Sequence, residues 1–310
     1  MYNCTGQKPV QILKGKVLIM ILVFRHLYLF LDSFSFLLLS ALGLSIIYGM
    51  MGIINQAHGE FIMLGAYFTS LLSVALHIPF VISIFLGAIL TGLLGLLLDR
   101  TIICRLYSRP LDSIVVTWGI SLILSQGIRI ILGNSVESIS TPLGSFTIGN
   151  EKFSTYRMVL VAVAVITLIV VYYIFNHTEF GLKARATMQR SDIAKSLGVN
   201  TDRMYAATFF IGSFLAGLTG GLYSPTMMVV PTMGTSFNMQ AFVTVIVGGS
   251  NPILGSFLSS ALLGVVNSEL SGWAGSFAGQ IGLLIMAIIF IRICPLGVSG
   301  LVDRLKAVRR

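Results

Sequence analysis

The sequence predicts an all-α polytopic membrane protein with about eight transmembrane helices and with broken or re-entrant segments near residues 52–61 and 248–255. Apolar residues occupy 55% of the 310 positions and charged residues only 10%, whereas soluble domains contain about 25% charged residues. Apolar runs recur along the chain, and each helical crossing of a bilayer needs roughly 20 such residues. Helices are the expected spanning elements because they satisfy their backbone hydrogen bonds internally.

An N-terminal extension, residues 1–32, precedes the predicted spans. Its apolar run, Val17–Leu31, is only 15 residues long and contains Arg25 and His26. It is therefore interpreted as an amphipathic segment or a partial span. A cleavable signal peptide is the alternative, but no small-residue cleavage site precedes Ser33.

The predicted transmembrane domain occupies residues 33–294 and is followed by a basic cytoplasmic tail, residues 295–310. Within the domain, the apolar runs that predict the spans are Ser33–Ile54, Phe61–Leu76, Phe80–Leu98, Ile114–Leu132, Met158–Phe175, Tyr205–Val229, Gln240–Val266 and Phe277–Ile293.

Basic residues set the predicted orientation. Seventeen of the twenty Lys and Arg residues lie in four segments, which are the N-terminal segment to Arg25, Asp99–Asp112, His177–Met204 and the tail from Arg292. The protein is expected to lie in the inner (plasma) membrane. By the positive-inside rule, all four segments face the cytoplasm. Orientation then explains the net charge of +9, and no nucleic-acid partner is expected.

The stretch Gln240–Val266 is predicted to form a broken or re-entrant hairpin. If His177–Met204 and the C-terminal tail share one side of the membrane, this stretch must cross an even number of times. Its centre, Gly248–Pro252, is a poor helix interior because glycine and proline both destabilise helices. Non-helical backbone at membrane depth is tolerated only beside protein or a watery cavity, so the break is expected to border an internal pathway.

A second segment has a sequence similar to this break. Gly52–Phe61 and Gly248–Phe257 align at a constant offset of 196 with four identities in ten positions. Common ancestry of two repeats and chance similarity in a glycine-rich chain are both compatible with this match. Paired interruptions of this kind are the best sequence indication of a solute site near the membrane midplane.

The residues of the two breaks are the candidate pathway residues. Glu60 and His58 lie between two apolar stretches with almost no polar linker, and ionisable groups there usually face a bundle interior. The alternative is a short turn in which Glu60 stabilises the next helix as an acidic first-turn residue. The pathway residues predicted from both breaks are Asn55, His58, Gly59, Glu60, Ser250 and Asn251.

Other polar and small residues in the spans are given structural roles. Gly212, Ala216 and Gly220 form a small-residue stripe, which is typical of close helix packing in membranes. Gln126 and Arg129 are assigned no function, because Arg129 is close enough to the end of a span to extend its charge toward the interface.

The segment 177–204 carries five basic and three acidic residues and is predicted to contain a docking element. Asp192–Leu197 is expected to form a short helix that ends at Gly198. A purely solvated loop would explain the charges, but it would not explain the apolar side chains of Ile193, Ala194 and Leu197.

Catalytic and nucleotide-binding motifs are missing from the sequence. No P-loop motif occurs, so any ATP must be hydrolysed by a partner subunit. No HExxH, GxSxG or His/Cys cluster with ligand spacing is found, so neither a catalytic centre nor a metal or cofactor site is predicted. The three cysteines share no close spacing and suggest no disulfide framework.

Gly43–Tyr67 closely resembles the signature of the inner-membrane permeases of branched-chain amino acid ABC importers and of their urea and short-chain amide relatives. The resemblance extends from about Ser33 to the tail. Three further blocks match in the same order; they are Gly181–Ala186 leading to Ala194–Gly198, then Ala216–Gly220, then Val247–Gly255. The chain departs from the pattern at its N-terminal extension, at Gln56 and at Ser250–Pro252, and these departures bear on the start site and the solute.

The resemblance implies a set of partners and a coupling role. Permeases of this family work in pairs, so a second permease subunit is expected in a homodimer or heterodimer, with two cytoplasmic ATPase subunits and an extracytoplasmic solute-binding protein. Residues 177–204 then form the cytoplasmic coupling loop of the permease domain. The residues implied to dock on the ATPase are Ser191, Asp192, Ile193, Ala194, Lys195, Ser196, Leu197 and Gly198.

The expected solute is small and neutral or zwitterionic, because the spans carry few fixed charges. Met233–Asn238 and Cys294–Gly297 resemble the urea and amide branch somewhat more than the amino-acid branch. The competing hypothesis is a self-sufficient secondary transporter or channel, which broken helices support equally well. Such a protein would move solute without ATP or a second protein.

Overall fold

The structure is a computed structural model that describes residues 8–107, 109–137, 139–149, 151–249, 251–294 and 297–300, with side chains from residue 19 onward. Its helices and strands are α1 (Lys8–Met51), α2 (His58–Ser70, continued by a π-helical turn at Leu71–Ala75), α3 (Phe80–Thr101, followed by a 3₁₀ turn at Ile103–Leu106), α4 (Pro110–Leu132), β1 (Ser145–Ile148), β2 (Glu151–Ser154), α5 (Thr155–His177), α6 (Glu179–Gln189), α7 (Ser191–Ser196), α8 (Thr201–Tyr223), α9 (Met233–Gly248), α10 (Pro252–Ala274) and α11 (Ser276–Ile293).

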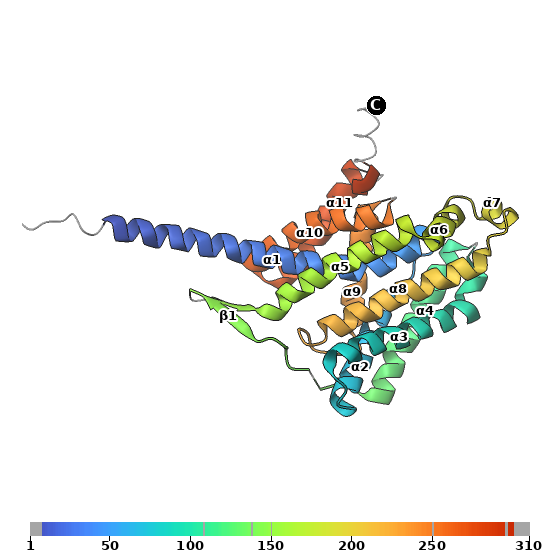
Figure 1. The fold of residues 1–310 in the computed structure, drawn as a ribbon, viewed down its shortest axis with the longest axis horizontal. Helices are drawn as coiled ribbons and strands as arrows, with labels where there is room; N and C mark the ends of the chain where they lie inside the picture. The colour runs from blue at the N-terminus through green and yellow to red at the C-terminus, as the bar shows by residue number, and fades with distance from the viewer. Residues whose placement is uncertain are drawn as a thin grey trace, which may run out of the picture.

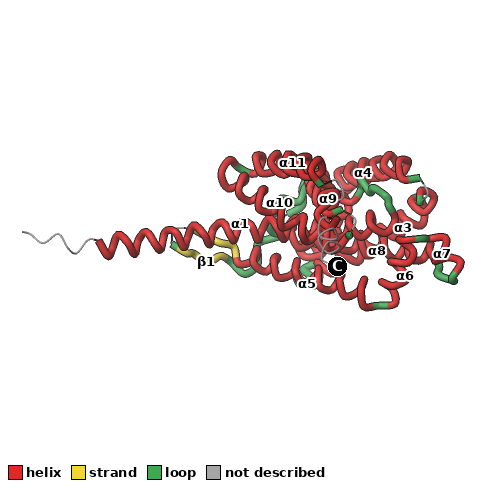
Figure 2. The backbone as a smooth tube through the Cα atoms, turned by 90° about the horizontal axis from the view of Figure 1, so that it is seen from above, coloured by secondary structure: helices red, strands yellow, loops and turns green. Residues whose placement is uncertain are grey.

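The predicted fold class is confirmed: the described chain is an α-helical bundle (Figures 1 and 2). Seven of its helices are long and apolar enough to cross a membrane, namely α1, α3, α4, α5, α8, α10 and α11. Two others are shorter: α9 contains 16 residues, and α2 contains 13 residues followed by the five of the π-helical turn. Since a helix rises 1.5 Å per residue, each is too short to cross a hydrocarbon core about 30 Å thick.

The N-terminal extension is continuous with the first span, whereas the sequence suggested a boundary near Ser33. α1 runs without interruption for 44 residues, a length of about 66 Å. At the predicted boundary, Asp32 pairs with Arg157 of α5. The Tyr28 hydroxyl lies 3.1 Å and 3.0 Å from the backbone oxygen and nitrogen of Ser154. Tertiary contacts with α5 and β2 therefore support the helix where polar residues alone suggested a break.

A β-hairpin lies beside the N-terminal half of α1. β1 and β2 pair antiparallel, with Phe146 opposite Phe153. The Phe153 ring packs edge-on against Phe24 and Tyr28 of α1, at centroid distances of 5.1 Å and 5.0 Å. This hairpin has no counterpart in the sequence prediction, because its strands have only four residues each.

The predicted orientation of the N-terminal segment is wrong. Figure 1 shows the N-terminal half of α1 and the β-hairpin at one end of the bundle and α6 and α7 at the other. α5 connects the two ends, from Thr155 after the hairpin to His177 before α6. Arg25, which lies 3.4 Å from Glu151 of the hairpin, and the segment 177–204 are therefore at opposite ends of α5, a membrane-spanning helix, and cannot face the same side of a membrane. The rule failed because α1 continues to the opposite end of the bundle, where Arg25 pairs with Glu151.

α8 packs in the interior of the bundle through small residues. A Cβ atom on Gly220 would overlap the carbonyl oxygen of Ile62 in α2, and one on Gly65 would overlap the backbone of Gly217. A Cβ atom on Gly212 would lie 2.8 Å from the Gly43 carbonyl oxygen of α1. The small-residue stripe is thus a packing surface against two neighbouring helices, as the sequence predicted.

Candidate translocation site

The first break returns the chain to the interior of the bundle. Residues 52–57 are non-helical, and α2 begins at His58. The Nε2 atom of His58 lies 3.0 Å from the carbonyl oxygen of Ser40. Ser40 lies eleven residues before the end of α1, which corresponds to about 16 Å along the helix axis. Six extended residues span up to about 20 Å, enough to cover this return. The interruption predicted near 52–61 is therefore present, and α2 starts inside the bundle.

A second short helix begins beside the first one. After α8 ends at Tyr223, the chain is largely non-helical until α9 begins at Met233. Gly234 packs so closely on Gly59 that a Cβ atom on Gly59 would overlap the Gly234 carbonyl oxygen. The amide nitrogen of Asn238 donates to the backbone oxygen of Gln56 at 2.9 Å and to its side-chain oxygen at 3.1 Å. The N-terminal ends of α2 and α9 thus meet within the bundle.

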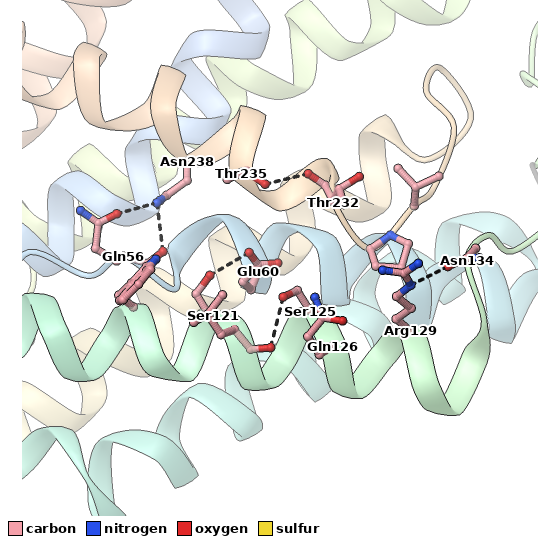
Figure 3. A pocket seen from close by; sticks show the side chains of 14 residues that line it. Gln56, Glu60, Ser121, Ser125, Gln126, Arg129, Asn134, Thr232, Thr235 and Asn238 are labelled. Atoms are coloured by element: carbon pink, nitrogen blue, oxygen red, sulfur yellow. Dashed lines mark hydrogen bonds between the residues drawn. The ribbon is translucent and has the colours of Figure 1, made fainter.

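A cavity of about 570 Å³ lies where these two helix ends face α4. Figure 3 shows Glu60 facing Ser121, with Gln126 and Arg129 farther along α4. The Ser121 hydroxyl donates to Oε1 of Glu60 at 2.9 Å, and Nε of Arg129 donates to Oδ1 of Asn134 at 2.9 Å. The lining residues are Gln56, Glu60, Trp118, Ser121, Leu122, Ser125, Gln126, Arg129, Asn134, Val230, Pro231, Thr232, Thr235 and Asn238.

The two helix ends favour negative charge at the cavity. Backbone N–H groups in the first turn of a helix have no partner within the helix, and the helix dipole is positive there. Neither Ala57 nor Thr232 caps its helix through a side chain, and only α2 carries an acidic residue, Glu60, in its first turn. The carboxylate of Glu60 also lies against Gly234 in the first turn of α9. The start of α9 therefore adds a positive dipole end beside Glu60 without an acidic residue of its own.

Glu60 provides the complementary negative group. Its residue surface is only 4% exposed, and its second oxygen, Oε2, has no hydrogen-bond partner among the described residues. Buried charged oxygens are normally paired, so this atom is suited to receive a donor from a solute. Oε2 of Glu60 lies against the start of α9, because a Cβ atom on Gly234 would overlap it. The acceptor and the helix end are therefore neighbours at the cavity, an arrangement that suits a zwitterion or a small polar neutral molecule.

The other predicted pathway residues of the first break do not line this cavity. Asn55 is buried, and its Oδ1 accepts the Ala57 N–H at 3.0 Å, which shapes the turn before α2. His58 is buried against α1, and Gly59 is held against Gly234. Of the four pathway candidates in this break, only Glu60 lines the large cavity.

The second predicted break is also present. α9 ends at Gly248 and α10 begins at Pro252, where Oδ1 of Asn251 accepts the Leu254 N–H at 3.2 Å. Asn251 and Gly52 both line a separate cavity of about 220 Å³, so the two breaks meet there. Ser250 lies outside the described residues. The pathway role of Asn251 and Ser250 stays a prediction.

Sequence reasoning missed the polar face of α4. Gln126 and Arg129 were assigned no function, yet both line the large cavity together with Ser121 and Ser125. These positions recur at helical spacing on one face of an otherwise apolar run. That periodicity was the available signal, because it separates an inward-facing polar stripe from one residue that reaches the interface.

The predicted docking element forms a short helix, α7, from Ser191 to Ser196. Gly198 has a φ of +86° and donates its N–H to the Lys195 carbonyl oxygen at 3.1 Å, so a glycine is favoured at this helix end. Leu197 is 79% exposed and Ile193 is 53% exposed, whereas Ala194 is buried. Two of the three predicted apolar side chains are thus available to a partner.

Short discontinuous helices around an internal polar cavity are features of a membrane transport protein. The chain belongs to the family of permease components of branched-chain amino acid transport systems, because the family model matches residues 27–294. It is a multi-pass protein of the inner membrane and a transport component of the ABC permease type.

Several relatives support this membership. The permease LivH of a high-affinity branched-chain amino acid transport system from Salmonella typhimurium is 27% identical over 84% of this chain and 90% of its own length. A probable LivH from Methanocaldococcus jannaschii is 27% identical over 86% and 89%. The ribose import permease RbsC from Haemophilus influenzae is 22% identical over 74% and 72%.

One solved structure has a similar fold. It is PsaBC from Streptococcus pneumoniae in complex with a Fab, which covers 90% of this chain and 94% of its own with a TM-score of 0.51. At 17% sequence identity, this similarity concerns the fold alone.

Proposed function

We propose that this chain is the permease subunit of an ATP-driven importer and that it conducts a branched-chain amino acid through the cavity between α2, α4 and α9. The observation that carries the proposal is the meeting of two uncapped helix N-termini and the buried carboxylate of Glu60 around one cavity of about 570 Å³. Cavities of roughly 300–1,000 Å³ commonly accommodate small molecules.

The cavity offers a place for each part of an amino acid. The N-terminal end of α9, which no side chain caps, suits the carboxylate, and Oε2 of Glu60 suits the ammonium group. Trp118, Leu122 and Val230 supply apolar walls for a branched side chain. Urea and short amides lack both charges and the apolar part, so the cavity favours the amino acid over these alternatives.

ATP is hydrolysed by partner subunits in this proposal. The expected assembly contains a second permease subunit, two cytoplasmic ATPases and an extracytoplasmic solute-binding protein. Residues Ser191–Gly198 dock on the ATPase through the exposed side chains of Ile193 and Leu197. Movement of this docking segment shifts the bundle between inward-open and outward-open packings. Such a shift requires that the free energies of the two packings differ by only a few kcal/mol.

Transport into proteoliposomes tests the proposal. Vesicles containing the full assembly are supplied with the solute-binding protein outside, ATP inside and labelled leucine, urea or acetamide. ATP-dependent uptake of leucine above that of urea and acetamide is expected. Uptake of any solute by this chain alone, without ATP, would instead support a self-sufficient transporter or channel, and preferential uptake of urea would overturn the solute assignment.

Leu197→Asp tests whether the segment Ser191–Gly198 docks on the ATPase. Because Leu197 is exposed, the substitution should leave the bundle folded while reducing co-purification of the ATPase by about tenfold, since it places an unpaired charge in a buried contact. Leu143→Asp is the matched control, because Leu143 is also exposed and lies just before β1, at the opposite end of the bundle. Equal ATPase recovery with both variants would contradict docking through Leu197.

A further inference from the structure

A second large cavity lies away from the proposed solute pathway. It has a volume of about 420 Å³ and lies between α1, α5, α6 and α10. Its apolar walls include Ile46, Met50, Phe175 and Ile253. It is at the end of the bundle that carries α6 and α7 (Figure 1), and it shares no lining residue with the cavity around Glu60.

One cation faces this apolar cavity with unused hydrogen-bonding capacity. Nη1 of Arg185 donates to Oδ1 of Asn176 at 3.3 Å. Its Nε is buried and has no hydrogen-bond partner, and no carboxylate lies within 4.0 Å, among the described residues. Leaving a buried donor unpaired is costly, and the guanidinium fork is suited to two oxygens of a carboxylate or phosphate. Arg185 is therefore suited to bind an oxyanion at this cavity.

The rim of the cavity indicates where that oxyanion comes from. Tyr172 is 45% exposed and Leu254 is 42% exposed, and both line the cavity. They belong to α5 and α10, two of the membrane-spanning helices. Tyr173, beside Tyr172, is exposed as well. Tyrosines near the end of a span are typical of the membrane interface, where phosphate groups and acyl chains meet.

We propose that this cavity binds one anionic phospholipid, with its phosphate on Arg185 and an acyl chain along Ile46, Phe175 and Ile253. Basic pockets between membrane helices are suited to lipid headgroups. A small inorganic anion would satisfy Arg185 but would leave the apolar walls without contacts. A phospholipid satisfies both parts of the cavity.

The bound lipid would connect two functional elements. Arg185 belongs to α6, which leads within two residues to α7, and the opposite wall contains Asn251 and Leu254 at the second break. A lipid seated between them would bridge α6 and the start of α10, which line opposite parts of the cavity. This proposal does not depend on which solute the protein carries.

Lipid retention by the purified full-length chain tests the proposal. The chain is extracted from membranes containing phosphatidylglycerol and phosphatidylcholine, and bound lipid is counted by native mass spectrometry. The wild type is expected to retain one phosphatidylglycerol, and Arg185→Gln should reduce that retention by about tenfold, the effect of losing a charged hydrogen bond. Arg190→Gln is the matched control, since Arg190 follows the same helix and does not line the cavity.

Two further measurements separate lipid binding in the cavity from a general effect of the Arg185 charge. Leu254→Trp, at the exposed rim, fills the cavity without removing a charge and should also abolish retention while the protein stays monodisperse. Thermal unfolding of the wild type should shift upward with phosphatidylglycerol but not with inorganic phosphate or phosphatidylcholine. Wild-type retention by Arg185→Gln, or an equal shift with inorganic phosphate, would overturn the proposal.

Discussion

The two helix breaks share local chemistry but differ in depth. In the first, Asn55 accepts the Ala57 N–H and Gly59 packs on the start of α9 at Gly234. In the second, Asn251 accepts the Leu254 N–H, and Gly255 packs on the end of α9 at Gly248. Each break therefore has an asparagine that shapes the turn and a glycine that contacts α9. The repeated sequence pattern corresponds to repeated local structure.

The difference lies in the number of residues between the helices. The first break has six non-helical residues and carries the chain back to the depth of Ser40, whereas only three residues separate α9 from α10 at the second. As a result, the first break places a helix N-terminus and Glu60 at the large cavity, whereas Asn251 of the second break lines the small one. The two breaks therefore share a motif but place their helix ends at different positions in the bundle.

The largest expected effect comes from the glycine contacts. A Cβ atom on Gly59 would overlap the Gly234 carbonyl oxygen, whereas one on Gly255 would lie 2.6 Å from the Gly248 oxygen. We expect Gly59→Ala to destabilise the protein by about 3 kcal/mol and Gly255→Ala by less, because overpacking forces the backbone to move. Thermal unfolding of the purified variants measures both.

Gly127→Ala is the control for these substitutions. Gly127 lies within α4, and a Cβ atom added there would meet no described atom within 4 Å outside the backbone of its own helix. Alanine at this position should therefore be neutral or stabilising by up to about 1 kcal/mol. If Gly59→Ala unfolded no earlier than Gly127→Ala, the close contact of α2 with α9 would be refuted.

The next effect concerns the charge of Glu60. Glu60→Gln keeps an oxygen that accepts from Ser121 but removes the negative charge. We expect leucine uptake to fall at least tenfold with little change in thermal stability, because an ammonium group loses a charged acceptor. Wild-type uptake by Glu60→Gln would remove Glu60 from the pathway.

A smaller effect is expected from the hydroxyl that orients Glu60. Ser121→Ala removes the 2.9 Å hydrogen bond to Oε1, and we expect uptake to fall about fivefold, since such a bond contributes roughly 1 kcal/mol. Ser125→Ala is the control on the same helix and cavity, because its hydroxyl donates only to the Leu122 backbone oxygen within α4. Similar uptake by both variants would show that Ser121 does not position the carboxylate.

The smallest effect is assigned to the cap of the second break. Asn251→Ala loses the hydrogen bond to the Leu254 N–H and should destabilise the protein by about 1 kcal/mol. Asn251→Ser should recover most of that loss, because serine also accepts at this position. Uptake by the folded fraction should be unchanged; a transport defect in Asn251→Ser would give the second break a role in solute passage.

The sequence by itself determined the fold class, both breaks and the end of α7. These features follow from local chemistry: lipid permits only internally bonded helices, glycine and proline interrupt them, and Gly198 adopts a positive φ. Long-range packing decided the rest. Only the contacts of α5 and the hairpin showed that α1 continues past Asp32 to the far end of the bundle.

The tertiary structure likewise decided how deep each short helix starts in the bundle and which face of each helix points inward. Whether Gln126 and Arg129 face lipid or a cavity depends on the rotation of α4 against α2 and α9, and whether a break turns or re-enters depends on where its helix finds a partner. Hydropathy counts how many residues are apolar. It does not show which face of a helix points toward the bundle interior, or at what depth in the bundle a helix starts. Both depend on contacts between residues far apart in the chain.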